Sequence, residues 1–190
     1  MPPRIKYAKE AVIRAALDVV RQGGPSALNA RAIAGRLGCS TQPLYRELRN
    51  MEEIRLSVME EAKKLFITRV TASGGLADTP YKSVGIAFLR FANEEKELFK
   101  LLFMRDRSGG RQEEDASDPT LAYTLEALMN TYGFTLEEAR AFHLHMSIYT
   151  HGLGVMVATN YTVFDEQAFS DALTDEFRAL TLLFSQKRAD

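Results

Sequence analysis

The chain has 190 residues, a formal net charge of −1, 46% hydrophobic residues and 26% charged residues, a composition that is typical of a folded globular protein and excludes a disordered or fibrous chain. Its single cysteine, Cys39, excludes an intramolecular disulfide and favours a cytoplasmic location. The most apolar stretch, residues 142–161, contains three histidines and an asparagine, so it is too polar for a membrane span and no membrane partner is expected.

Charge is distributed unevenly along the chain. Residues 1–50 contain nine basic and three acidic residues, a net charge of +6, whereas the remaining residues contain 15 basic and 22 acidic ones, a net charge of −7. A basic end on an acidic body indicates that one segment meets a polyanion. The alternative is a chance imbalance of solvated surface charge.

Helical patterns follow one another through the first fifty residues. Apolar residues at three- and four-residue spacing predict a helix over residues 8–21. Asn29 is a good N-cap for a second helix that ends at Gly38, and Ser40 caps a third over residues 41–48. Two short helices joined by a tight turn are typical of a helix-turn-helix, whose second helix enters the DNA major groove.

The polar residues of this pattern are candidates for DNA contacts. Those early in the third helix can hydrogen-bond to base edges: Thr41, Gln42 and Arg46. Four other residues can reach phosphates: Asn29, Ser40, Tyr45 and Arg49. The backbone N–H groups at the start of the fourth helix can do so as well. The alternatives are that the arginines are solvated surface charges and that Tyr45 belongs only to the core. Cys39 is either a small buried hydrophobe or a thiol whose oxidation releases DNA.

Many spacings in this segment match a known family. The segment from about Lys9 to Arg55 resembles the DNA-binding domain of the TetR family of bacterial regulators. The matching run is Asn29-x-Arg31-Ala32-Ile33-Ala34-x-Arg36-Leu37-Gly38-Cys39-Ser40-x-x-x-Leu44-Tyr45-x-x-Leu48-x-Asn50-x-Glu52-Glu53-Ile54. The resemblance implies a homodimer that represses promoters and releases DNA when a small molecule binds. It also implies DNA contacts from Arg31, Thr41, Gln42, Tyr45 and Arg46.

Three positions depart from the family's usual pattern. Asn29 stands where Thr is usual, and Asn caps a helix equally well. Glu47 stands where an aromatic residue or His is usual, and a carboxylate near phosphate is repelled unless it accepts from a cytosine amino group. Met51 stands where Lys is usual, which removes one expected phosphate contact. These departures bear on DNA affinity and on the recognised sequence.

The rest of the chain is predicted to be helical as well, because no segment shows sustained alternation of apolar and polar residues. The expected helices lie at about residues 50–71, 80–93, 95–104, 118–133, 135–160 and 165–187, with an exposed loop at 106–117. The fold class is therefore all-α with about nine helices. It comprises a three-helix DNA-binding headpiece over residues 1–50 and a ligand-sensing and dimerising helical bundle over residues 51–190.

The last two expected helices are candidates for a homodimer interface. Gly152, Gly154 and Ala158 are small residues that would let another helix approach closely, and a twofold dimer needs a self-complementary patch. The alternative is ordinary packing within one chain.

A small-molecule effector is expected to bind among the apolar residues of the bundle. The candidate lining residues are Phe66, Phe88, Phe91, Phe103, Tyr123, His143, Met146 and Tyr149. The alternative is that these residues are simply core.

Other classes of protein fit the sequence less well. An enzyme is not indicated, since no nucleophile–base pair, phosphate-binding loop or catalytic residue can be proposed, and no cofactor is expected. His143, His145 and His151 lack carboxylates at metal-ligand spacing, so no metal site is predicted. A helical interaction or ligand-binding module that has lost specific DNA binding is the alternative to a repressor that recognises a near-palindromic operator.

Overall fold

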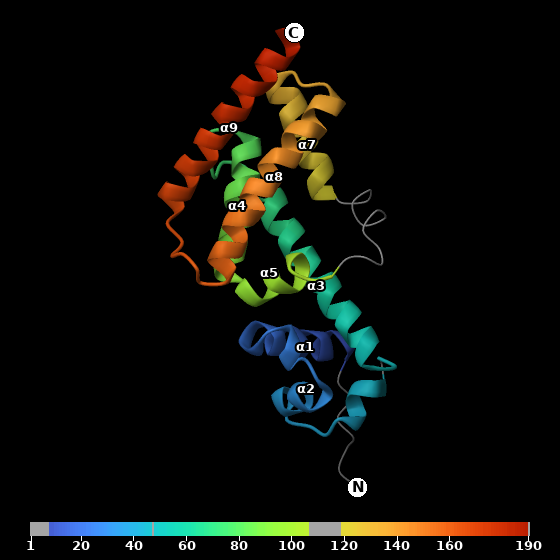
Figure 1. The fold of residues 1–190 in the computed structure, drawn as a ribbon. Coiled ribbons are helices and arrows are strands. Elements are labelled where there is room, and N and C mark those ends of the chain that lie inside the picture. The colour runs from blue at the N-terminus through green and yellow to red at the C-terminus, as the bar shows by residue number, and fades with distance from the viewer. Residues whose placement is uncertain (1–7, 47, 107–118, 190) are drawn as a thin grey trace. The chain divides into compact units, whose positions relative to one another are not determined.

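The computed structural model describes residues 8–46, 48–106 and 119–189. Over these ranges the chain forms eight α-helices and two 3₁₀ helices, without a strand (Figure 1). This confirms the predicted all-α fold. Contacts divide the chain into two units. We call Met1–Leu65 with Glu95–Arg105 the N-terminal unit, and Phe66–Glu94 with Asp106–Asp190 the C-terminal unit. The segment Glu95–Arg105 is thus grouped with the N-terminal residues. The division by function after residue 50 does not include this segment in the headpiece.

The N-terminal unit begins with helix α1 (Lys9–Gly23), whose apolar stripe is buried. The buried residues recur at the spacing of one helix face: Val12, Ala15, Ala16, Val19 and Val20. Gly24 ends the helix with a φ of 77°, and its N–H donates to the Val20 carbonyl at 2.8 Å. A short 3₁₀ helix, η1 (Pro25–Ala27), follows.

Helix α2 (Ala30–Leu37) has the caps that the sequence predicts. The Asn29 side chain accepts a hydrogen bond from the Ala32 N–H at 3.0 Å. Gly38 ends the helix in the left-handed conformation, with a φ of 66°. The N–H of Cys39 then bonds back into the last turn, as in a Schellman motif. Cys39 is half-buried beside this turn.

The third predicted helix differs from expectation. The structure has a five-residue 3₁₀ helix, η2 (Gln42–Arg46), where the sequence predicts an α-helix over residues 41–48. Pro43 removes one backbone donor near its start, and a segment this short gains little from i→i−4 bonds. Leu44 and Leu48 are fully buried and anchor the segment in the core. Its position is as predicted, although its helix type is not.

Two further helices complete this unit. Helix α3 (Met51–Thr71) crosses the boundary between the units, and α5 (Lys96–Phe103) packs against α1 and η1. The Asn50 side chain accepts from the Glu53 N–H at 2.9 Å, and the Glu53 carboxylate accepts from the Arg49 N–H at 2.8 Å. The first bond satisfies a backbone donor in the first turn of α3, and the second fixes the chain just before the helix.

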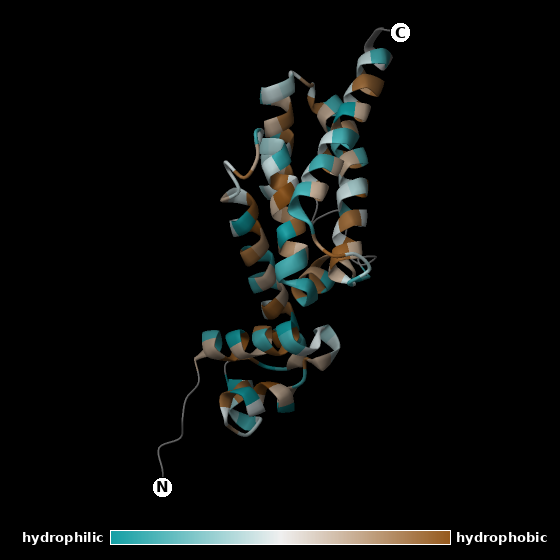
Figure 2. Ribbon diagram, turned by 90° about the vertical axis from the view of Figure 1, so that its left-hand side faces the viewer, coloured by the Kyte–Doolittle hydropathy of each residue, from teal (hydrophilic) through white to brown (hydrophobic). Residues whose placement is uncertain are grey.

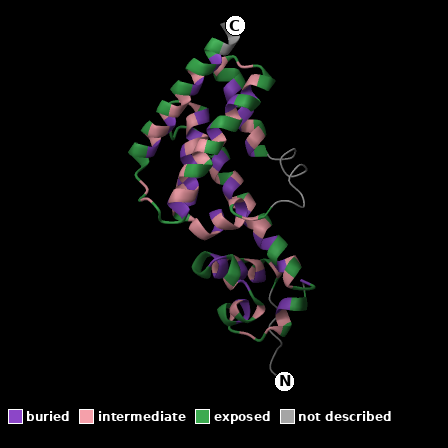
Figure 3. Ribbon diagram, in the orientation of Figure 1, coloured by how far each residue is buried: buried purple, intermediate pink, exposed green. Residues whose placement is uncertain are grey.

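The C-terminal unit is built around α4 (Pro80–Glu94), which packs against α7 (Pro119–Tyr132), α8 (Leu136–Ala158) and α9 (Glu166–Ala189). The predicted starts and ends agree with these bounds to within about two residues, and the predicted loop lies almost wholly outside the described residues. Buried residues line the inner faces of these helices, whereas much of α8 and α9 is exposed on the outside (Figure 3).

Close packing in this unit depends on a glycine and on aromatic rings. A Cβ on Gly85 of α4 would lie 3.1 Å from a methyl group of Leu173 on α9. The aromatic core of the unit draws on α4, α7, α8, α9 and the turn before α8; its members are Tyr81, Tyr132, Phe134, Phe142, Phe177 and Phe184. None of the described helices combines the length and apolar character needed to cross a lipid bilayer.

Candidate nucleic-acid interface and effector site

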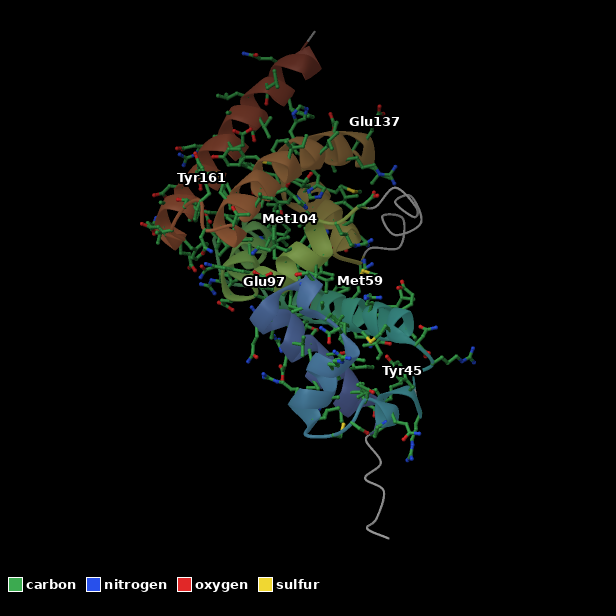
Figure 4. The ribbon with its side chains drawn as sticks, turned by 60° about the horizontal axis from the view of Figure 1, so that its bottom comes forward. Tyr45, Met59, Glu97, Met104, Glu137 and Tyr161 are labelled. Carbon is green, nitrogen blue, oxygen red and sulfur yellow. The ribbon has the colours of Figure 1, made fainter. Side chains whose placement is uncertain are left out.

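The residues predicted to contact DNA lie on one continuous stretch of the N-terminal unit, from the start of α2 to the segment before α3. Thr41 is half-buried, and the side chains of the others are exposed: Asn29, Arg31, Ser40, Gln42, Tyr45, Arg46 and Arg49. Tyr45, labelled in Figure 4, is 40% exposed, although its neighbour Leu44 is fully buried. The 3₁₀ helix therefore buries its leucine while presenting polar side chains to solvent.

The arginines of this unit fall into two groups. Arg31, Arg46 and Arg49 are exposed, and within the described ranges none of their guanidinium groups pairs with a carboxylate. Arg21 and Arg36, in contrast, are tied into ion pairs by Asp18 and other partners. All three arginines that the sequence assigns to DNA belong to the unpaired group, which within the described residues also includes the exposed Arg14 of α1. Unpaired guanidinium groups can bind phosphates or guanine edges without first breaking an internal bond.

Asn29 has a structural task in addition to any contact with DNA. Its Oδ1 accepts from the Ala32 N–H at 3.0 Å, and its Nδ2 donates to the Ala27 carbonyl at 3.0 Å. One Nδ2 hydrogen remains for an outside acceptor such as a phosphate. The main role of Asn29 in this structure is therefore to fix the start of α2.

The start of α3 is less suited to phosphate than the sequence predicts. Glu52 and Glu53 lie in its first turn, and the Glu53 carboxylate is 3.9 Å from Lys9 Nζ. Carboxylates here favour the helix dipole but repel a phosphate. Met51 is half-buried and supplies no compensating charge. Glu47, the other departure from the family pattern, lies outside the described residues.

A charge network that local sequence patterns reveal only in part connects three helices of the N-terminal unit. Arg36 of α2 and Arg21 of α1 both pair with Asp18, at 3.4 and 3.6 Å, and Arg21 also binds Glu95 at the start of α5. The spacing of Asp18 and Arg21 suits a helical pair. The contacts to Glu95 join residues 74 positions apart, which no local pattern could reveal.

Three of the residues predicted to line an effector pocket pack together in the C-terminal unit. Phe66 packs edge-on against Phe88 and Phe91, with ring centroids 5.9 and 5.3 Å apart, and all three are buried. His151 lies on Phe88 at 4.7 Å. Phe103 falls in the N-terminal unit and contacts Phe99. Met146 is buried, and Tyr123 and Tyr149 are half-buried.

His143 has a different partner. Its Nδ1 lies 3.2 Å from the hydroxyl of Tyr81, a residue that is not among the predicted lining residues. Burial lowers the pKa of His143 to about 4, with a smaller contribution from the nearby His151 in the same direction. Burial also raises the pKa of Tyr81 above its usual value, with a smaller contribution from Tyr132. Both groups are therefore neutral at physiological pH.

The three histidines of α8 do not converge. His143 binds Tyr81, whereas His151 Nδ1 lies 2.8 Å from the Ser147 carbonyl. His145 lies edge-on to Phe184. Across residues 8–46, 48–106 and 119–189, no three His, Cys, Asp or Glu residues group as metal ligands would.

The small residues of α8 have separate roles. Gly154 and Ala158 are buried within the chain, so they serve packing between its own helices. Gly152 is exposed, and a Cβ there would meet no atom within 4 Å. The exposed large apolar residues of α8 and α9 lie elsewhere, at Leu136, Leu144, Ile148, Leu182 and Leu183.

Comparison with known proteins supports the architecture. No protein-family model matches the sequence, and no curated protein matches it. A TetR-like transcriptional regulator from Rhodococcus sp. RHA1 superimposes with a TM-score of 0.70 at 16% identity, covering 95% of this chain and 98% of the other. A TetR family member from Streptomyces coelicolor A3 gives 0.59 at 19% identity, covering 88% and 96%.

A third structure is SmeT, the repressor of the Stenotrophomonas maltophilia multidrug efflux pump SmeDEF. It superimposes with a TM-score of 0.58 at 20% identity, covering 92% of this chain and 90% of the other. The similarity extends over both units in each case. This chain therefore has the all-helical fold of the TetR-type transcriptional regulators.

Proposed function

We propose that this protein is a sequence-specific DNA-binding transcriptional regulator that acts as a repressor in the cytoplasm. The observation that carries the proposal is the set of exposed, unpaired arginines and polar side chains from the start of α2 to the segment before α3. Arg31, Arg46 and Arg49 supply charge for phosphates, and Gln42 and Arg46 supply donors for base edges.

A homodimer would place two such surfaces on one operator. Leu144 and Ile148 of α8 and Leu182 of α9 are between 59 and 67% exposed. The Phe142–Phe184 contact at 5.4 Å brings these stretches of the two helices alongside one another. We infer that these exposed apolar side chains belong to one surface, which a second copy can cover by twofold symmetry. Half-sites about one DNA turn apart, ~34–36 Å, would then be expected in a near-palindromic operator.

Effector binding is proposed for the C-terminal unit. The Phe66, Phe88 and Phe91 cluster supplies apolar surface, and the neutral Tyr81–His143 pair supplies hydrogen-bonding groups without charge. These features suit a small, largely apolar molecule. SmeT is the repressor of a multidrug efflux pump, which is in keeping with such a ligand. Binding would release DNA by shifting the protein between two conformations.

The deciding experiment is a gel-shift titration with the DNA that flanks the protein's own gene. It should include excess non-specific competitor and two salt concentrations. A discrete complex that survives competitor is the expected result. Binding that disappears with competitor or modest salt would reflect only phosphate attraction. The acidic first turn of α3 would then favour the alternative, an interaction module without specific DNA binding.

A thermal-shift screen tests the effector proposal separately. A ligand that binds only the folded protein raises the melting temperature. Small apolar compounds are expected to do so, and the same compounds should dissociate the DNA complex. A panel of hydrophobic compounds that never raises the melting temperature would argue against an effector site.

A further inference from the structure

The charge network of the N-terminal unit contains a shared carboxylate. Asp18 Oδ2 accepts from Arg36 Nη2 at 3.4 Å, while Asp18 Oδ1 lies 3.6 Å from Arg21 Nη1. Arg36 also donates from Nη1 to Gln22 Oε1 at 2.6 Å. Asp18 is therefore the only carboxylate, within the described ranges, that holds Arg36 and thus helix α2 to α1.

Glu95 is the stronger of the two carboxylate partners of Arg21, the other being Asp18. Arg21 donates to both Glu95 oxygens, from Nε at 2.8 Å and from Nη2 at 2.9 Å. Such a two-bond pairing is shorter and stronger than the looser contact with Asp18. The Glu95 side chain is also only 12% exposed, whereas Asp18 is 35% exposed. Arg21 is thus directed mainly to Glu95, which leaves Asp18 available to Arg36.

Glu95 belongs to a segment that arrives from far along the chain. It is the residue before α5, which packs on α1 and η1. A Cβ on Gly24 would lie 2.7 Å from a carboxylate oxygen of Glu97, so α5 approaches the end of α1 closely; Glu97 is labelled in Figure 4. The preceding residue, Glu94, ends α4 and pairs with Arg69 at 2.6 Å within the C-terminal unit. Glu94 and Glu95 therefore each pair with an arginine of their own unit.

We propose that Glu95 is a positioning residue for DNA binding, which acts by holding Arg21 in a two-bond pairing so that the contact between Arg21 and Asp18 stays loose. When the Glu95 carboxylate is lost or α5 withdraws, Arg21 tightens its contact with Asp18 and competes with Arg36 for that carboxylate. Helix α2 then loses one of its ties to α1. Since α2 carries Arg31 and leads into η2, the DNA-contacting side chains lose their alignment. This inference rests on the proposed DNA-binding function.

The test compares Glu95→Gln with the double variant Glu95→Gln/Arg21→Gln. Glutamine keeps the shape of the carboxylate but not its charge. Glu95→Gln should weaken specific DNA binding by about two- to fivefold, the effect of one exposed ion pair. The double variant should recover wild-type binding, because the competitor for Asp18 has gone. A purely structural role would leave the double variant as weak as the single one or weaker.

A second readout does not need DNA. Hydrogen exchange of the α2 backbone amides should be faster in Glu95→Gln and return to the wild-type rate in the double variant. Glu94→Gln, which changes the neighbouring carboxylate, should alter neither readout. Equal binding and exchange in wild type and Glu95→Gln, or no recovery in the double variant, would overturn the inference. If wild-type protein binds no operator but the exchange pattern holds, the network stands and the proposed function fails.

Discussion

At the scale of single residues, the arginines proposed to contact DNA differ from Arg21 and Arg36 in having no carboxylate partner within the described residues. The sequence alone does not distinguish Arg36 from Arg46, since both are arginines of the same basic segment. The structure shows that Arg36 is engaged with Asp18 and Gln22, whereas Arg46 is exposed and has no carboxylate partner within the described ranges. Only the second kind of arginine can bind DNA without losing an internal bond.

Replacing Arg46 by Ala should therefore weaken operator binding by about 1–3 kcal/mol and relax specificity at one base pair. The measurement is a fluorescence-anisotropy titration against operator and scrambled DNA. Lys64→Ala is the matched control, because Lys64 is a 67%-exposed cation that pairs with Glu61 on α3. Equal affinity in both variants would remove Arg46 from the interface.

His143 makes stability depend on pH in a predictable direction. Its pKa in the folded protein is about 4, below the ordinary value of about 6.5. Between these values the unfolded chain binds more protons than the folded one, so stability is complete above about pH 6.5 and declines as pH falls toward 4. Urea unfolding across this range should show a shallower decline for His143→Gln than for wild type. Parallel curves would contradict the assignment.

At the scale of elements, the end of α2 shows how one backbone conformation closes the helix-turn-helix. Gly38 has a φ of 66°, and a Cβ there would meet no atom within 4 Å, so a side chain at this position meets backbone strain and no steric clash. Gly35 lies in the same helix with equally open surroundings but ordinary helical backbone. The two glycines therefore form a matched pair.

Opposite effects on stability are expected from alanine at these two positions. Gly38→Ala should destabilise the protein by about 1 kcal/mol because alanine resists the left-handed conformation. Gly35→Ala should stabilise it by up to about 1 kcal/mol because alanine is the better helix former. Chemical denaturation measures both, and a loss of the same size at both positions would show that backbone conformation is not the cause.

At the scale of the whole molecule, the exposed apolar side chains of α8 and α9 are candidates for an interface with a second copy of the chain. Figure 2 shows hydrophobic residues on these helices. Those among them that are exposed include Leu144, Ile148, Leu182 and Leu183. Isolated apolar residues are common on surfaces, but a cluster on two neighbouring helices is typical of an interface.

Placing a charge in this surface should separate the proposed dimer. Ile148→Glu would bury a carboxylate in an apolar contact and forfeit about 1.5–3 kcal/mol of burial in each protomer. Sedimentation velocity should show monomers, and operator affinity should fall with them. Leu136→Glu is the control, since Leu136 is 46% exposed in the first turn of α8, where an acid is compatible with the helix. A stable Ile148→Glu dimer would place the interface elsewhere.

Local chemistry along the sequence determined most of the helices. Asn29, Gly38 and the Thr135–Glu138 capping box mark helix ends through hydrogen bonds that span only a few residues. The helical periodicity likewise predicted the buried stripe of α1. The type of η2 was missed because the gain from α-helical bonds over five residues is too small for propensity to decide.

Tertiary structure alone decided which charges are paired and which aromatic rings meet. Arg21 and Glu95 are 74 residues apart, and Tyr81 and His143 are 62 apart. No local rule predicts such pairs, because they depend on how whole helices pack. For the same reason the sequence could select arginines as a class for DNA binding, but only the folded chain distinguishes those that are unpaired from those held by Asp18 and Glu95.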